Sequence, residues 1–423
     1  MSALEINLLL AALVLVMLGL RQYMVVVLGV VSVGLYYFYS NGEYLNTILD
    51  AWQNANNQIF LSIPLFMLAG NLMSHGSIAT RLVRVMRALT SPIPGGLALA
   101  AVASCAVFAA ICGSSTVTML AVGGVLYPAM LKAGYDKKFS IGLLMAGGTL
   151  GIIIPPSIPM ILYGIMTNTS ITDLFKAGIL PGIFLALLLA SYAVFMNRHM
   201  KGVPWNAKEI LVSFKDGIWA LLVPVIILGG IYTGWFTATE SAVVAVVYAL
   251  LIDSLMYKNL NFKQIVRITS DTVQMSGSLF PMLIMAVSLN VFLSAKHVPE
   301  LLVGMITGYF TSQASFLIAS NFVLMIVGCL MDIGSAILIF APILTPVAIK
   351  LGMDPVHFGL IMMVNLELHY LTPPMGMNLL VAANVYKEDY GLLCRAAVPF
   401  IGLMFLGLLV VVLFPQLSLA LVK

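Results

Sequence analysis

The chain has 423 residues, of which 61% are hydrophobic and only 9% are charged, and its mean hydropathy is +1.07. A soluble domain carries roughly 45–50% apolar and about 25% charged residues, so this composition excludes an ordinary soluble protein and indicates a polytopic membrane protein. The formal net charge of +4 says little about a substrate, and we expect no nucleic acid among the partners.

Helices, and not the strands of a barrel, are expected to cross the lipid bilayer. Apolar runs of about 17–25 residues recur, whereas a barrel would show alternating segments of about ten residues. Four cysteines lie in or beside these runs without a CxxC pair, so we interpret them as small core residues and not as a disulfide framework. They are Cys105, Cys112, Cys329 and Cys394.

The N-terminal part predicts two short apolar segments and then a surface segment. Residues 4–20 and 22–39 are apolar. The first run has no basic segment before it, so we expect a retained helix and not a cleaved signal. Residues 40–57 are polar and slightly acidic, which predicts a loop or a surface helix.

The next membrane segment opens at Ile63 and leads to a basic helix. Arg81, Arg84 and Arg87 are spaced three apart, which places them on one face of an amphipathic helix. We expect this helix to lie at the lipid headgroups.

A charge-free run from Ala88 to Leu131 holds a polar cluster at residues 113–116. One straight helix over residues 96–131 would be about 54 Å long, against a hydrocarbon core of about 30 Å. A turn at the polar cluster removes this mismatch, so we predict a re-entrant hairpin over about 96–131. Non-helical backbone at that depth is tolerated where it is buried in protein or lines a cavity.

Residues 139–172 have the same length problem and contain Pro155-Pro156. Two adjacent prolines remove two amide donors and forbid a continuous helix. We therefore predict a broken helix over about 139–172 that is unwound around 147–158.

Two basic connections predict the orientation in the membrane. They lie at residues 197–216 and 257–268, separated by the apolar runs 217–236 and 239–257. Two crossings place both connections on the same side, and the positive-inside rule makes that side cytoplasmic. Further spans are expected at 178–196, 272–293 and 396–422.

The second half of the chain repeats the first. Nine of the thirty-one positions from 126 to 156 are identical to the residues 218 positions later. The same shift places Asp332 opposite Ser114. The identical pairs are Leu126/Leu344, Pro128/Pro346, Lys132/Lys350, Gly134/Gly352, Asp136/Asp354, Met145/Met363, Leu150/Leu368, Pro155/Pro373 and Pro156/Pro374.

This internal repeat predicts an all-α polytopic membrane protein made of two repeats, residues 1–215 and 216–423. The second repeat would hold a re-entrant hairpin at about 314–349 and a broken helix at about 357–386. Paired interruptions of this kind are expected in a secondary transporter.

The polar breaks are the candidate binding sites. Unwound backbone between Gly147 and Pro155 would offer carbonyl oxygens, and the hairpin tip offers hydroxyls. Such ligands suit a hard monovalent cation, whereas half-helix N-termini can point at an anion; helix packing is the alternative role for the hydroxyls. The hydroxyl residues are Ser114, Ser115, Thr116 and Thr118.

The second half varies this design with a carboxylate. Asp332 lies in a run from 301 to 349 that has no other charge, and an intramembrane acid is a functional hypothesis by default; the alternative is a helix cap. Glu367, which corresponds to Thr149, could line the site, be neutral or pair with His369. The other residues of this break are Gly334, Ser335, Thr372, Pro373, Pro374, Gly376, Met377 and Asn378.

No enzyme motif accompanies these breaks. The sequence has no GxSxG, HExxH or Walker A pattern and no cluster of metal ligands. We expect no organic cofactor and no catalytic residue, and the energy source must be an ion gradient or an outside partner.

Seven motifs in order resemble the large membrane subunit of tripartite ATP-independent periplasmic (TRAP) transporters. The resemblance covers essentially the whole chain, with one departure, since Ala238 stands where that family usually has proline. The motifs are Ile63–Asn71, Gly113–Ser115, Ile154–Pro159, Leu174–Gly182, Phe236–Glu240, Met331-Asp332 and Leu371–Leu379.

The resemblance implies a sodium-driven elevator in the bacterial inner membrane, in which a transport domain slides against a scaffold. Its substrate would be a small organic acid, such as a C4-dicarboxylate, sialic acid or another sugar acid. A periplasmic binding protein would deliver the substrate. A small membrane subunit would brace the scaffold, and we expect it to be a separate chain.

The resemblance also implies residue roles. Sodium would bind Ser114, Ser115, Thr116, Gly147, Gly148 and Ile153 in the first half, and Asp332, Gly334, Ser335, Thr372, Gly376 and Met377 in the second. Substrate would lie between the hairpin tips, near Ser115, Thr118, Pro155, Pro156, Pro373, Pro374 and Asn378.

Two alternatives remain. A single-component ion-coupled carrier or a sodium/proton antiporter would use Asp332 and Glu367 as proton carriers. A membrane-embedded enzyme is disfavoured because no nucleophile–base or metal pair is visible.

Overall fold

The structure, a computed structural model, describes residues 3–20, 22–310, 312–329, 331–374 and 376–422, and the regular elements of these residues are all helical. The first ten α-helices are α1 (Ala3–Gly19), α2 (Met24–Tyr39), α3 (Asn46–Ala55), α4 (Ser62–His75), α5 (Ile78–Thr90), α6 (Gly96–Cys112), α7 (Ser115–Lys132), α8 (Lys137–Ile153), α9 (Ile158–Thr167) and α10 (Ile171–Met196). The others are α11 (Ala207–Tyr232), α12 (Ala238–Leu250), α13 (Phe262–Ala295), α14 (Val298–Tyr309), α15 (Gln313–Gly328), α16 (Ile333–Lys350), α17 (Pro355–Leu368), α18 (Met377–Tyr386), α19 (Tyr390–Leu413) and α20 (Gln416–Leu419), with short 3-10 or π segments η1 (Gln58–Leu61), η2 (Leu251–Met256) and η3 (His369–Leu371).

Membrane-length segments dominate this all-α architecture. Among the described residues, nine helical segments are long and apolar enough to cross a bilayer. They comprise η1 with α4, α7, α8 with α9, α10, α11, α12 with η2, α13, α16 and α19. The chain is therefore built as a polytopic membrane protein.

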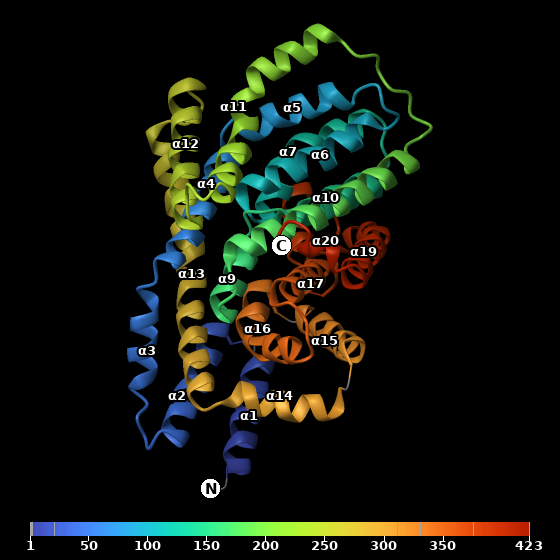
Figure 1. The fold of residues 1–423 in the computed structure, drawn as a ribbon. Helices are drawn as coiled ribbons and strands as arrows, with labels where there is room; N and C mark the ends of the chain where they lie inside the picture. Colours follow the sequence, from blue (N-terminus) through green and yellow to red (C-terminus); the bar gives the residue numbers. More distant parts are fainter. Residues whose placement is uncertain (1–2, 21, 311, 330, 375, 423) are drawn as a thin grey trace.

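The helices form two groups (Figure 1). One group contains α2, α3, α4, α12 and α13, and the long helix α13 contacts the first three of these. The other group contains the paired helices α6 and α7 together with α8, α10 and α15–α19. The groups meet where Gly70 of α4 faces Cys112, the last residue of α6; a Cβ on Gly70 would lie 2.5 Å from the Cys112 Cβ.

A tight turn joins α6 to α7. Gly113 adopts a left-handed conformation, with φ of 62°, and ends α6. Residues with a side chain rarely adopt this conformation. The chain then re-enters a helix at Ser115, so the turn at 113–114 separates two helices of 17 and 18 residues.

The interruption before Pro155 is shorter than the sequence suggested. Residues 147–153 are helical and belong to α8, and the break comprises residues 154–157. A proline disfavours helical backbone at the residue before it and removes its own amide donor, but it imposes nothing on the turns further upstream. In the second half, likewise, Met377 and Asn378 are already helical, since α18 begins at Met377, soon after η3 ends at Leu371.

The basic connections are also more helical than expected. Residues 207–216 form the start of α11, because the Asn206 side chain accepts hydrogen bonds from the amides of Lys208 and Glu209. The two connections meet, since the Tyr257 hydroxyl donates to the Asp216 carbonyl at 2.6 Å. They therefore lie at the same end of the molecule.

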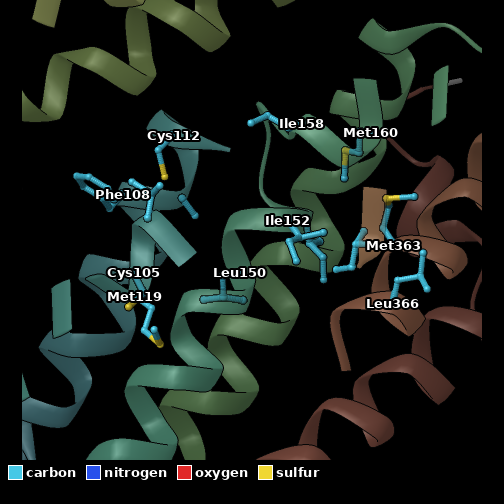
Figure 2. Close-up of a cluster of buried hydrophobic side chains, with 14 of the residues drawn as sticks. Cys105, Phe108, Cys112, Met119, Leu150, Ile152, Ile158, Met160, Met363 and Leu366 are labelled. Carbon is cyan, nitrogen blue, oxygen red and sulfur yellow. The ribbon is translucent and has the colours of Figure 1, made fainter. Parts of the chain in front are cut away.

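The core runs through the second group of helices (Figure 2). Phe108 and Cys105 on α6 lie on one side of α8, and Met363 and Leu366 on α17 lie on the other. Residues 139–153 of α8 are all buried. A helix that is apolar on every face is a central one, so α8 is the element around which both halves are assembled.

Candidate functional site

The tip of the first hairpin lies against the break between α8 and α9. The Ile158 amide donates to the Gly113 carbonyl at 3.3 Å. A Cβ on Gly113 would lie 2.6 Å from the Pro156 carbonyl oxygen, and one on Gly151 would lie 2.6 Å from the Ser114 oxygen. The two polar interruptions of the first half therefore touch, and the absence of side chains at these glycines allows the contact.

A buried hydrogen-bond network joins this tip to the second half. The Asn378 side-chain amide donates to the Ser115 hydroxyl at 2.8 Å and to the Met145 carbonyl at 3.0 Å. The Ser115 hydroxyl lies 3.1 Å from the Asn378 side-chain oxygen. Asn378, on α18, is fully buried. Residues 115 and 378, both expected at the site, are thus brought together, although they are 263 positions apart.

The second hairpin makes the reciprocal contact. α16 packs against α9 as α7 packs against α18, and a Cβ on Gly334 would lie 3.7 Å from Leu162 of α9. Each hairpin therefore lies against the second half-helix of the other half of the chain.

Asp332 caps helix α16. Its carboxylate accepts a hydrogen bond from the Ser335 amide at 3.1 Å, and the Ser335 hydroxyl also donates to it. Asp332 is exposed, whereas Ser335 is fully buried. The Asp332 carboxylate thus caps a helix, which is the alternative role that the sequence analysis gave for it. Because Asp332 is exposed, its carboxylate is still open to a further ligand.

Two other candidate residues, Thr118 and Thr372, already have protein partners. The Thr118 hydroxyl donates to the Ser114 carbonyl at 2.8 Å, and that of Thr372 donates to the Leu368 carbonyl at 2.8 Å. Thr118 is fully buried and also lies 3.1 Å from the Cys112 sulfur. These side chains are occupied in helix-end contacts of the kind that hydroxyls make in membrane helices.

The expected carbonyl ligands divide into two sets. Gly147 and Gly148 lie inside α8, where a carbonyl accepts the amide four residues later. Ile153 is the last residue of α8, where carbonyls lose their intrahelical partners. Thr116 lies in the first turn of α7, and Gly376 precedes the first residue of α18, Met377.

The double prolines differ in exposure. Pro155 and Pro156 are buried, whereas Pro373 and Pro374 are exposed, and both bonds are cis. The backbone around Pro373 is therefore the more accessible of the two breaks.

Glu367 is fully buried beside Thr149, its counterpart in the repeat. Within the described residues its two carboxyl oxygens make no hydrogen bond of ordinary geometry, and no ion pair joins it to His369. Residues two apart on a helix face different directions. Sequence reasoning missed another buried polar group on α17, Asn365, whose amide donates to the Asn321 side-chain oxygen at 2.8 Å. An Asn two residues before Glu367, in an otherwise uncharged apolar segment, was the available signal.

Comparison with known proteins identifies the family. The family model for the tripartite ATP-independent periplasmic transporter, DctM component, matches residues 10–417. The chain belongs to this family. It is a TRAP large permease, a multi-pass membrane transporter subunit and not an enzyme, and its family implies a small membrane subunit and a periplasmic binding protein as partners.

Two relatives show the range of the family. The C4-dicarboxylate TRAP transporter large permease protein DctM of Pseudomonas aeruginosa is 38% identical over 376 residues, which are 88% of each chain. The isethionate TRAP transporter permease protein DctMQ of Oleidesulfovibrio alaskensis is 37% identical over 84% of this chain and 56% of its own, longer chain.

A solved structure shares the fold. The YdaH transporter of Alcanivorax borkumensis superposes with a TM-score of 0.64, covering 92% of this chain and 90% of its own, at 14% identity. At that identity the likeness concerns architecture alone.

Proposed function

We propose that this TRAP large permease imports a small organic acid across the bacterial inner membrane, driven by sodium. The observation that carries the proposal is the crossed contact of each hairpin with the half-helix of the other repeat, joined by Asn378 and Ser115. Relatives named for C4-dicarboxylates and isethionate support an organic acid; sialic acid and other sugar acids remain in the same class.

The sodium ligands proposed from the sequence fall into a narrower set once the geometry is considered. Ser114 and Ser115 at the first tip, and Asp332 at the second, are helix-start residues with oxygen atoms at a break. The Ile153 carbonyl ends a helix, which makes it a better candidate than those of Gly147 and Gly148. An ion bound there would order the tips before substrate binds, which is linkage between two sites.

The transport step is proposed as an elevator movement of the second helix group against the first. The small membrane subunit would brace the group that contains α4 and α13, and the binding protein would deliver substrate. The connections 197–216 and 257–268 would face the cytoplasm, because they meet at one end and together hold seven of the twenty lysines and arginines.

Uptake into proteoliposomes tests this function. The chain would be reconstituted with its small subunit, with and without an inward sodium gradient and the binding protein, and screened with labelled organic acids. We expect uptake only when sodium and binding protein are both present. Uptake by the chain alone would instead assign it to the single-component carriers.

Replacing Ser115 with Ala tests the sodium site. The change removes one hydroxyl, so half-maximal uptake should require several times more sodium. Ser104→Ala is the matched control, since Ser104 is equally buried in the same hairpin and its hydroxyl has no partner within the described residues. An unchanged sodium titration for Ser115→Ala rejects that ligand.

Proton coupling is the second candidate, and the buried carboxyl of Glu367 is the observation that favours it. A proton gradient that drives uptake without sodium, and a Glu367→Gln variant that loses this driving force, would support it over sodium coupling.

A further inference from the structure

A groove of about 590 Å³ lies between α5, α7 and the segment 203–210. Val125, Leu126 and Ala129 of α7 form an apolar wall, and α5 contributes Arg84 and Arg87. Both guanidinium groups belong to exposed residues. The groove therefore combines a hydrocarbon wall with a positively charged edge.

The two arginines differ in how fully they are paired. Arg84 lies 3.1 Å from Glu209 and 3.7 Å from Asp216. Arg87 forms no ion pair within the part of the chain that the structure describes. Glu209 is the single acid among the residues that line the groove. The lining thus keeps one uncompensated positive charge.

The groove opens in a setting typical of a membrane surface. Trp205 is 64% exposed, yet its indole N–H donates to the Leu89 carbonyl at 2.9 Å. The Val203 amide donates to the Ser91 carbonyl at 2.8 Å. These bonds hold an exposed aromatic ring beside the groove, where tryptophan commonly marks the headgroup level.

The second half contains a groove of similar form without the arginines. It has a volume of about 730 Å³ and lies between α14 and α16. The shift of 218 places Leu302 and Met305 opposite Arg84 and Arg87. Since the second groove forms without guanidinium groups, the architecture does not require them, and Arg87, which has no ion pair among the described residues, can serve a ligand.

We propose that the α5–α7 groove binds the phosphate headgroup of an anionic phospholipid, with an acyl chain along the α7 wall. Arginine presents several donors in a planar fork that fits phosphate oxygens. Basic pockets between membrane helices on the cytoplasmic side bind anionic headgroups. The apolar wall favours a lipid over a free phosphate ion.

The test is thermal unfolding of the full chain in nanodiscs of phosphatidylcholine with increasing phosphatidylglycerol. The unfolding midpoint should rise with phosphatidylglycerol, and Arg87→Gln should need about fivefold more of that lipid for the same rise. Lys350→Gln, which removes a charge from the second groove, should behave like the wild type. Glu209→Gln removes the one acid that lines the groove and the nearer ion-pair partner of Arg84, so this variant should need less lipid.

Three outcomes overturn the proposal. They are an unchanged lipid dependence in Arg87→Gln, an equal loss in Lys350→Gln, and a rise of the same size from inorganic phosphate in pure phosphatidylcholine discs. Should Arg87→Gln fail to fold, Arg87→Lys replaces it. That variant keeps the charge and should keep most of the lipid dependence, so a complete loss there also contradicts a headgroup site.

Discussion

Asp332 shows how one carboxylate can serve both structure and binding. As an N-cap it accepts the Ser335 amide, and an amide side chain caps nearly as well as a carboxylate. Asp332→Ala should therefore lower the free energy of unfolding by about 0.5–2 kcal/mol, whereas Asp332→Asn should leave it nearly unchanged. Thermal unfolding measures this difference.

The same pair of variants separates the cap from the ion site. If the charge of Asp332 helps to bind sodium, Asp332→Asn should fold normally and still lose coupled uptake. Wild-type uptake by Asp332→Asn would restrict this residue to its capping role.

Glu388 gives the molecule a pH-dependent contact between its halves. Lys137 at the start of α8 lies 2.7 Å from its carboxylate, and the Tyr127 hydroxyl donates to it at 3.0 Å. The hydrogen bond from Lys137 holds the pKa of the Glu388 carboxyl below its ordinary value. Its contribution to stability is complete above the ordinary pKa of 4.5 and is lost as the pH falls through the lower, folded-state pKa.

The expected effect is small, since Lys137 is 47% exposed and such pairs contribute about 0.2–1 kcal/mol. Wild type should melt slightly above Glu388→Gln at pH 7, and the gap should close below about pH 4. Thermal unfolding at several pH values measures the gap. A gap that stays constant across this range would show that ionisation of Glu388 is irrelevant.

At the scale of elements, the approach of α8 to the hairpin tip depends on Gly151. A Cβ there would lie 2.6 Å from the Ser114 oxygen and 2.9 Å from the Thr118 hydroxyl. Backbone cannot yield as a flexible side chain does, so Gly151→Ala should destabilise the fold by about 1–3 kcal/mol. Gly124→Ala in α7 is the matched control, because no atom lies within 4 Å of its added Cβ. Equal melting temperatures for the two variants would contradict the close contact.

Element positions could be predicted from length and proline placement, but element ends could not. The polar cluster at 113–116 and Pro155-Pro156 had to interrupt helices, because apolar runs of that length exceed the bilayer. The end of α8 at Ile153 and the start of α11 at Ala207 depend on local capping and on packing against neighbours. A run of apolar residues indicates neither the capping contacts nor the packing against neighbours.

The sequence predicted the helix interruptions that make up the candidate site, but it did not predict the hydrogen bonds that join them. The repeat of 218 positions indicated that residues 114 and 332 are equivalent. It did not indicate that Asn378 would donate to Ser115, because that contact is between non-equivalent positions of the two halves. Crossed pairing of this kind depends on how the two halves pack in three dimensions, which a linear comparison of the halves does not contain.

At the scale of the whole molecule, the contact of Gly70 with Cys112 has a consequence for chemical labelling. Cys112 is fully buried and its Cβ faces Gly70 of the other group, while the thiol of Cys105 faces Gly147 within one group. Cys329 and Cys394 are only partly buried. If the groups slide during transport, a maleimide should reach Cys112 at a rate that depends on sodium and substrate, while Cys105 should remain unmodified throughout. Mass spectrometry of the labelled peptides would then measure the rate of the movement, with a native cysteine as the probe. Equal protection of both thiols under all conditions would mean that the contact between Gly70 and Cys112 never opens.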